Sequence, residues 1–446
     1  MKLQRYLALS VLATLLFVSC SEDAPVADPS LGSINPDVYV AIGNSLTAGY
    51  QSGALFEEAQ LYSYPNIIAQ QIGTPEFVQP LIPYPGTGQL MVLRQITPTP
   101  IITQGEAMVA APKNADHPAP YHNLGIPGAV LADAIDESDI QQRAAERGNP
   151  FYPIIMRNQD AFGKSVVAQA IKLQPTLITF WLGSNDVFGY AASGGTRGTD
   201  QTGTLPTDPQ NFEFYLATAL DLIKANLPET EVLIGNIPDV TVNPLFNTVP
   251  RKIPSPLNPS QLLDVYYTTN DQQRAVVGPG DYILLTAQTE LAQGVGIDPE
   301  NPLPSQYVLD ASEVQVAQDA VAAFNAAIDR QANEHGYTVV DMHALMNELN
   351  NGGISLAGET YTSDYISGGV FSLDGVHLMQ RGNVLVANYF IEAMNRAYGA
   401  NIRQAATYDV PGFPAPTGVG KRGKGPVWDI GMRFPAVDIT QLTACW

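Results

Sequence analysis

Apolar residues in this chain fall into short continuous runs that alternate with longer segments of helical period. Four apolar runs, each ending near glycine or a small polar residue, cover residues 38–43, 176–182, 231–238 and 337–341. Helical spacing of apolar residues covers 64–73, 165–173, 212–225, 312–333 and 380–398. Continuous apolar runs are typical of strands buried on both faces of a parallel sheet. The alternation predicts an α/β fold of three layers, with a central parallel sheet between helices.

The first apolar run leads directly into a serine. It ends in Gly43, passes through Asn44 and Ser45, and continues in a pattern that can start a helix. Ligands bind at the carboxyl ends of strands in such sheets, so Ser45 is expected at the mouth of a site. A serine hydroxyl becomes a nucleophile only when a base takes its proton. The role of Ser45 therefore depends on a base elsewhere in the chain.

One of the five histidines meets this requirement. His377 follows Asp374 by three residues, on a segment just before the helical pattern of 380–398. An aspartate at this spacing can reach the Nδ1 atom of the imidazole and leave Nε2 facing the serine. Ser45, His377 and Asp374 thus form a candidate nucleophile, base and orienting acid.

The other histidines are weaker candidates. His117 and His122 lie in loops without a carboxylate at suitable spacing, and His335 is expected at the solvent-facing end of a helix. Asp341 and His343 form a rival pair, but they lack the sequence pattern that surrounds His377. No cluster of His, Asp or Glu has the spacing of a metal site, and no phosphate or dinucleotide loop is present. No metal or cofactor is expected.

Four short motifs resemble those of the SGNH (GDSL) hydrolase family, and they occur in that family's order. They are Gly43-Asn44-Ser45-Leu46, Asn123-Leu124-Gly125-Ile126-Pro127-Gly128, Gly183-Ser184-Asn185-Asp186 and Asp374-Gly375-Val376-His377. The resemblance covers residues 37–240 and 312–398. It implies an SGNH-like α/β/α fold and a serine hydrolase of carboxylic esters that forms an acyl-enzyme without a cofactor.

The resemblance also implies an oxyanion hole, which holds the negative oxygen of the tetrahedral intermediate. Its donors would be the backbone N–H of Ser45, the N–H of Gly128 and the side chain of Asn185. Gly125 is the alternative to Gly128, and Asp186 is expected to order the loop.

The chain departs from the family pattern in two places. Asn44 stands where the family's motif has Asp, and Leu378-Met379-Gln380 replaces the usual Pro beginning after His377. Neither change removes a group with an implied catalytic role.

The substrate class stays open between alternatives. Lipases and deacetylases share this catalytic set, so the ester is either a general small-molecule carboxylic ester or an O-acetyl group on a carbohydrate. A non-catalytic, glycan-binding surface lipoprotein is a third alternative. Two proline-rich segments interrupt the α/β pattern, an excursion at 74–120 and an insertion at 239–310. Within the insertion, helices are expected at 260–267 and 284–291. Both segments are expected on the side of the site, and the insertion offers aromatic residues for acyl chains or sugar rings, namely Phe246, Tyr266, Tyr267 and Tyr282.

The N-terminus is typical of an export signal. Lys2 and Arg5 precede an apolar run at 6–18, which is too short for a stable membrane anchor. Cys20 follows a small residue, as at a lipoprotein cleavage site, and Ser21-Glu22-Asp23 resembles a surface-export signal of Bacteroidetes lipoproteins. We expect a protein anchored by lipid on Cys20 to the bacterial outer membrane, on its periplasmic or cell-surface side. An ordinary secretory signal is the alternative.

Composition limits the partners and defines the remaining segments. The formal net charge of −21 disfavours nucleic acid and anionic head groups, so membrane contact is expected only through Cys20. With Cys20 lipidated, Cys445 has no partner for an internal disulfide. The predicted organisation is a signal peptide at 1–19, a flexible tether at 20–36, a hydrolase domain at 37–398 and a Gly/Pro-rich tail at 399–446.

Overall fold

A parallel sheet of five strands forms the centre of the computed structural model. The structure describes residues 28–412, except 96–99, 197–198, 201–202, 256–257, 259 and 357. The strand order is β17-β10-β7-β1-β6, and all four pairings are parallel. The strands are β1 (Tyr39–Gly43), β6 (Asn123–Gly125), β7 (Leu177–Trp181), β10 (Glu231–Gly235) and β17 (Thr338–Val340). The expected parallel sheet is confirmed; β6 was not expected, because three residues carry no strand-like apolar run.

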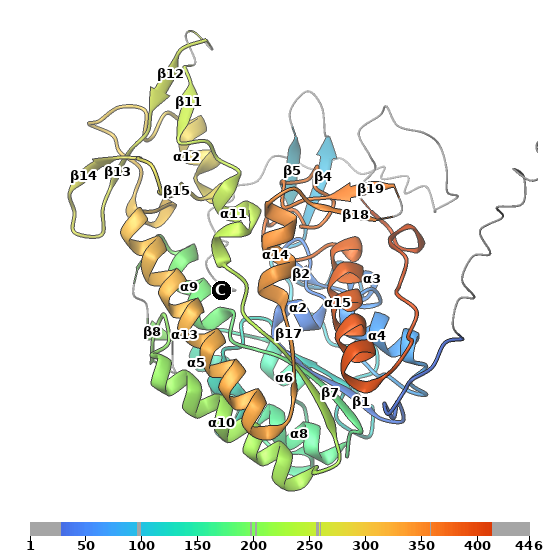
Figure 1. Cartoon of the computed structure of the whole chain (residues 1–446). Coiled ribbons are helices and arrows are strands. Elements are labelled where there is room, and N and C mark those ends of the chain that lie inside the picture. The colour runs from blue at the N-terminus through green and yellow to red at the C-terminus, as the bar shows by residue number, and fades with distance from the viewer. Residues whose placement is uncertain are drawn as a thin grey trace, which may run out of the picture.

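Helices cover both faces of this sheet (Figure 1). One face carries α8 (Val166–Lys172), α10 (Pro209–Asn226) and α13 (Ala311–His335), and the other carries α4 (Tyr64–Ile72), α14 (Met342–Asn350) and α15 (Gln380–Tyr398). Successive strand residues point to opposite faces, so Val40 and Ile42 join the first apolar core while Tyr39 and Ala41 join the second. The three-layer α/β/α class is confirmed.

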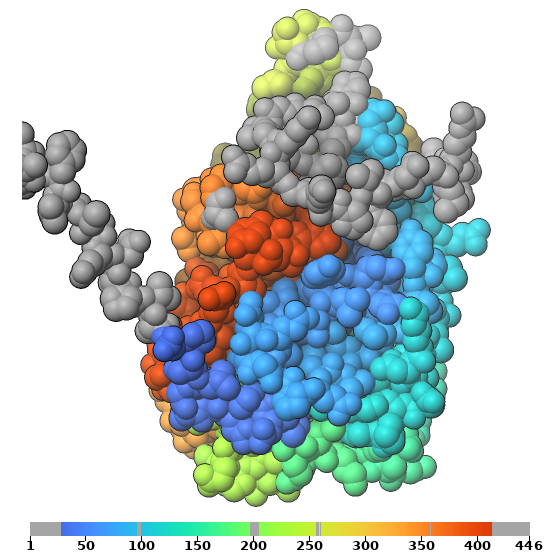
Figure 2. All heavy atoms as spheres, turned by 90° about the vertical axis from the view of Figure 1, so that its right-hand side faces the viewer, coloured from blue at the N-terminus to red at the C-terminus, as the bar shows by residue number. Residues whose placement is uncertain are grey.

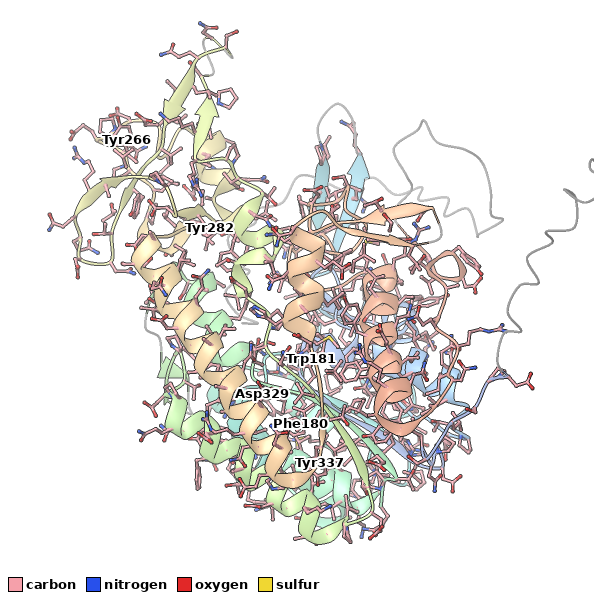
Figure 3. The ribbon with its side chains drawn as sticks, viewed as in Figure 1. Phe180, Trp181, Tyr266, Tyr282, Asp329 and Tyr337 are labelled. Atoms are coloured by element: carbon pink, nitrogen blue, oxygen red, sulfur yellow. The ribbon has the colours of Figure 1, made fainter. Side chains whose placement is uncertain are left out.

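Stacked aromatic side chains fill both cores. Phe212 of α10 stacks on Phe324 of α13 with ring centroids 4.0 Å apart. On the opposite face, Tyr64 of α4 stacks on Phe390 of α15 at 5.2 Å, and both lie edge-on to Trp181. Figure 3 shows Trp181 in the sheet. Fully burying each such side chain stabilises the fold by about 1.5–3 kcal/mol. The cores thereby fix β7 and α15, the elements that flank two of the motifs.

The helix boundaries follow from capping residues in the sequence. Helix α4 has Pro65 in its first turn and ends at Gly73, whose φ of 71° is left-handed. Helix α13 starts one residue before the expected segment, because Asp310 caps it. The Asp310 carboxylate accepts from the N–H groups of Ser312 and Glu313, while Glu313 accepts from the N–H of Asp310.

The insertion at 239–310 consists mainly of short antiparallel pairs, drawn in yellow in Figure 1. They are β11 (Lys252–Pro254) with β12 (Leu262–Asp264), β13 (Tyr266–Thr268) with β14 (Arg274–Val276), and β15 (Tyr282–Ile283) with β16 (Val308–Leu309). The helix expected at 260–267 is wrong. Val265 and Tyr267, two residues apart, face one small core of the insertion, which is strand periodicity. The helix expected at 284–291 is confirmed by α12 (Gln288–Ala292) and the 3₁₀ turn η3 (Leu285–Ala287).

Residues near both ends of the described chain pack together. Ser30 pairs with Asn401, and the N–H of Ser33 donates to the carbonyl of Tyr398 at 3.0 Å. Figure 2 shows these N-terminal residues in deep blue beside the red C-terminal segment. The flexible tether expected at 20–36 is therefore wrong for residues 30–34, whose Ile34 is buried against the second core.

Several expectations fall outside the part of the chain that the structure describes. They concern the signal peptide, Cys20, Cys445 and the tail from residue 413. Within the described ranges, no helix has the length and apolar character that crossing a membrane requires.

Candidate active site

The nucleophile candidate lies where β1 turns into a short helix. Ser45 is the first residue of α2 (Ser45–Ala48), and the Asn44 side chain caps that helix by accepting from the N–H of Leu46 at 3.0 Å. A Cβ atom on Gly43 would lie 1.9 Å from Thr47 Oγ1. Only glycine therefore allows so tight a turn, and this turn holds Ser45 at the carboxyl edge of the sheet.

Ser45, His377 and Asp374 form a continuous chain of hydrogen bonds. Ser45 Oγ lies 2.8 Å from His377 Nε2, and His377 Nδ1 lies 3.0 Å from Asp374 Oδ2. The three residues are 7%, 3% and 3% exposed, respectively. The structure thus brings together the three residues that the sequence analysis singled out.

Asp374 is buried but surrounded by hydrogen-bond donors. Burial alone would raise the pKa of its carboxyl, but His377 and the backbone N–H groups of Val376 and His377 lower that pKa to about 2. The ionised carboxylate only accepts hydrogen bonds, so the proton of the neutral imidazole resides on Nδ1. Nε2 is then the acceptor for the Ser45 hydroxyl, which is the arrangement a general base requires.

A second layer of contacts holds the carboxylate from the opposite side. Ser372 Oγ donates to Asp374 Oδ1 at 3.0 Å, while the N–H of Gly53 donates to Oδ2 at 3.1 Å. The N–H of Ser52 donates to Ser372 Oγ at 2.9 Å, so the Ser372 proton is directed at Asp374. Ser52 has a φ of 52°, a left-handed conformation that is uncommon for a residue other than glycine. The 52–53 loop is thus bent to present two adjacent N–H groups to the 372–374 segment.

The excursion at 74–120 supports this loop. The N–H groups of Gln89 and Met91 donate to the carbonyls of Gly53 and Ser52, both at 2.7 Å. The excursion was expected over the active-site face. None of its described residues lines the cleft at Ser45. The excursion instead supports the 52–53 loop, which in turn holds Asp374.

Gly128 occupies a turn that fits the oxyanion role. The turn runs from Ile126 to Ala129 and is closed by the Ala129 N–H donating to the Ile126 carbonyl at 3.0 Å. Pro127 and Gly128, the latter at a φ of 80°, stand where a type II turn favours proline and glycine. The Gly128 N–H has no acceptor within the described ranges, and neither does the N–H of Ser45.

Gly125, the alternative donor, has a packing role. Its N–H donates to Asn123 Oδ1 at 3.0 Å and is therefore occupied. A Cβ atom at this position would lie 2.4 Å from the nitrogen of Ala48. Glycine at 125 lets β6 approach α2, and the geometry favours Gly128 over Gly125 as the donor.

Asn185 is tied to the same turn. It begins α9 (Asn185–Ala192), after β7, and its Nδ2 donates to the Ala129 carbonyl at 2.8 Å. A primary amide carries two N–H bonds, so a second donor is left. Asp186 accepts from the N–H of Leu131 at 2.8 Å and from Thr207 Oγ1 at 2.8 Å, and thereby orders the surrounding loops. Since β6, β1 and β7 are neighbours, Gly128, Ser45 and Asn185 follow adjacent strand ends.

A cleft of about 530 Å³, open solvent included, lies over Ser45 and His377. Its polar lining comes from the motifs and from one position of the insertion: Asn44, Ser45, Ser184, Asn185, Asn243 and His377. Its apolar lining consists of Leu46, Phe188, Pro238, Val240, Met346, Phe371 and Val376. The expected aromatic residues of the insertion are not among these residues, and Figure 3 shows Tyr266 and Tyr282 away from the sheet.

Two of the remaining histidines have structural partners elsewhere. His343 Nδ1 lies 3.2 Å from the Ile237 carbonyl, while Asp341 caps α14 by accepting from the N–H of Ala344. His335 is bound to the Gln331 carbonyl and to Asp221, so the expected solvent-facing position is wrong for its ring. The described residues contain no group of three or more His, Cys, Asp or Glu able to hold a metal.

Sequence reasoning missed two sets of residues in the site. Ser52, Gly53 and Ser372 hold the carboxylate, and Phe188 and Met346 form part of the cleft wall. Only Ser372 carried a local signal, because it lies two residues before Asp374. The others reach the site through tertiary contacts that no short motif encodes.

The family assignment rests on the sequence as a whole. The model of the GDSL-like lipase/acylhydrolase family matches residues 39–390, which include all four motifs. The chain therefore belongs to this family, whose members are in general esterases and acylhydrolases. No match to the chain is found among curated proteins.

Solved structures match much of the chain at low sequence identity. A protein of Parabacteroides merdae, proposed to be a GDSL-like lipase, is 15% identical with a TM-score of 0.34, over 82% of this chain and 99% of its own. Phospholipase A1 from Streptomyces albidoflavus is 12% identical with a TM-score of 0.33, over 81% and 98%. A family 3 carbohydrate esterase from Clostridium thermocellum is 12% identical with a TM-score of 0.31, over 81% and 99%. Likeness at this level does not indicate a shared substrate.

Replacing Ser372 with alanine tests the layer of contacts behind Asp374. Ser372→Ala removes one of the donors that fix the orientation of the Asp374 carboxylate and so of His377, which should lower kcat for an ester on the order of tenfold. With one donor fewer, the Asp374 carboxylate attracts the protonated ring of His377 more strongly than in the wild type. The low-pH limb of the kcat–pH profile should therefore move to higher pH.

Ser52→Ala is the matched control for this variant. It removes the Oγ atom that accepts from the N–H of Leu373, but it keeps the N–H that donates to Ser372. Its acid limb should coincide with that of the wild type. An unshifted limb in Ser372→Ala would mean that Ser372 only packs against the site.

Proposed function

We propose that the chain is a serine hydrolase of carboxylic esters. The observation that carries this proposal is the hydrogen-bonded series from Ser45 through His377 to an ionised Asp374. Ser45 Oγ attacks the ester carbonyl while His377 Nε2 accepts its proton and then delivers it to the departing alcohol. Water, activated by the same nitrogen, releases the acyl group from Ser45. Asp374 fixes the tautomer of His377 and stabilises the cation that forms.

The negative oxygen of the tetrahedral intermediate would be held by three donors. These are the N–H groups of Ser45 and Gly128 and the remaining Nδ2–H of Asn185. Support comes from the adjacent strand ends that carry the three residues and from the unoccupied backbone donors. Donors of this kind are effective because they are already oriented when the charge develops.

The substrate that fits the cleft best is an ester with an apolar acyl chain. Seven of the residues that line the cleft are apolar, among them Phe188 and Met346. A carbohydrate O-acetyl esterase is the alternative, which a preference for acetyl esters would favour. A glycan-binding protein without activity has no physical need for the ordered Ser45–His377–Asp374 series.

The proposed location follows from the N-terminal sequence. We propose that residues 1–19 direct export and that lipid on Cys20 anchors the protein to the outer membrane. The support is the order of a basic start, an apolar run and a cysteine after a small residue. Membrane contact would then arise from this lipid anchor.

Ester hydrolysis by the chain from residue 21 onward tests the activity. A series of p-nitrophenyl esters from acetyl to palmitoyl should be hydrolysed, with the highest kcat/KM above acetyl because of the apolar lining. Ser45→Ala should reduce kcat by on the order of 10⁴-fold or more, because the nucleophile is lost.

Ser355→Ala is the matched control and should retain full activity. Ser355 is exposed and lies in β18 (Ile354–Leu356), which pairs with β19 (Glu359–Tyr361). Turnover that survives in Ser45→Ala would contradict the assignment of the nucleophile. An optimum at acetyl would favour the carbohydrate esterase.

Activity should fall in acid because protonated His377 cannot accept the Ser45 proton. Asp374 is not the group that titrates, since its pKa is lowered to about 2 and it stays ionised above that value. A plot of log kcat/KM between about pH 4 and 8 should therefore decline toward low pH with the slope of a single proton. A flat profile down to about pH 4 would contradict histidine as the base.

A further inference from the structure

None of the described residues that line the cleft over Ser45 has a carboxylate, ammonium or guanidinium group. Among these residues, only His377 can carry a charge. Its polar groups are hydroxyls and side-chain amides, and the rest of its wall is apolar. An ion that enters such a cleft loses hydrating water without gaining a counter-ion. This desolvation costs several kcal/mol of binding free energy.

The charged side chains that adjoin lining residues in the sequence, Asp186 and Asp239, are both acidic. Asp239 stands between two residues that line the cleft, Pro238 and Val240. Its carboxylate accepts from Thr241 and from Gln318 Nε2, and no described lysine or arginine forms an ion pair with it. The formal net charge of −21 adds a repulsive field for any anion that approaches.

Two amides in the cleft have donors without partners. Asn44 is 2% exposed, and its Oδ1 accepts from the Leu46 N–H, whereas its Nδ2 has no acceptor in the described part of the chain. The side chain of Asn243, which precedes α11 (Pro244–Asn247), makes no hydrogen bond to any described residue. Amides donate to neutral carbonyl, ether and hydroxyl oxygens without requiring charge on the ligand.

We propose that this site selects uncharged esters and rejects esters that bring a carboxylate or phosphate into the cleft. The substrate class is a neutral ester with an apolar acyl chain, whose remaining oxygens accept from Asn44 and Asn243. This inference rests on the proposed ester hydrolase activity. It disfavours phospholipids, whose phosphate lies close to the ester and would meet no cation in the cleft.

Three esters that differ only at the far end of the acyl chain test the proposal. They are p-nitrophenyl hexanoate, methyl p-nitrophenyl adipate and mono-p-nitrophenyl adipate, which end in a methyl group, a neutral ester and a carboxylate. After subtraction of spontaneous hydrolysis, kcat/KM for the carboxylate should be lower than for the neutral adipate by about 100-fold or more. The two neutral esters should lie within about tenfold of each other.

Asn243→Lys supplies the missing cation, and Asn243→Gln is its matched control. The lysine variant should raise the ratio of kcat/KM for anionic over neutral adipate by about tenfold, and added salt should reduce that gain. The glutamine variant should keep the wild-type ratio.

The outcomes separate this inference from the proposed activity. Failure of the wild type on all three esters would overturn the ester hydrolase function itself. Hydrolysis of both adipates at equal kcat/KM would leave that function intact and overturn the charge selectivity. The comparison of substrates on wild type decides the matter even when Asn243→Lys does not fold.

Discussion

The site depends on one buried carboxylate that is held from two distant parts of the chain. Asp374 receives the N–H of Gly53, the hydroxyl of Ser372, two backbone N–H groups of its own turn and His377 Nδ1. These donors outweigh the cost of burial and keep the carboxyl ionised. The contact between the 52–53 loop and Ser372 spans 320 residues of sequence, so the base is oriented only when the domain is fully folded.

The sheet supplies the other constraint, which is the position of the reacting groups. Adjacent strands β6, β1 and β7 end at the same edge, and each is followed by one of the proposed oxyanion donors. Glycines make this edge compact: side chains at Gly43 and Gly125 would collide with α2. The cleft that results combines a nucleophile and base with an apolar, uncharged wall. In the proposed function, the strand ends supply the reacting groups, while α9, α14 and the start of the insertion line the cleft.

Much of this arrangement could be predicted from local sequence, and the remainder could not for physical reasons. The proximity of Ser45, Asp374 and His377 could be predicted because strand ends and a three-residue spacing are local signals. Helix α15 was predicted with its observed bounds because its apolar period is long and glycine ends it. The 260–267 segment was assigned to the wrong element, because short apolar runs do not distinguish a helix from a strand. Ser52 and Met346 reach the site only through tertiary packing, for which no short pattern exists.

The central claim, an activated serine at position 45, is tested most directly by covalent labelling. A fluorophosphonate reacts with a serine whose proton is taken by a neighbouring base and whose oxyanion is stabilised. Intact-mass measurement and peptide mapping should show one adduct, on Ser45, that disappears in His377→Ala and persists in His335→Ala, a variant whose histidine does not line the cleft. An unlabelled Ser45 in the folded wild type, or labelling that does not require His377, would contradict the account.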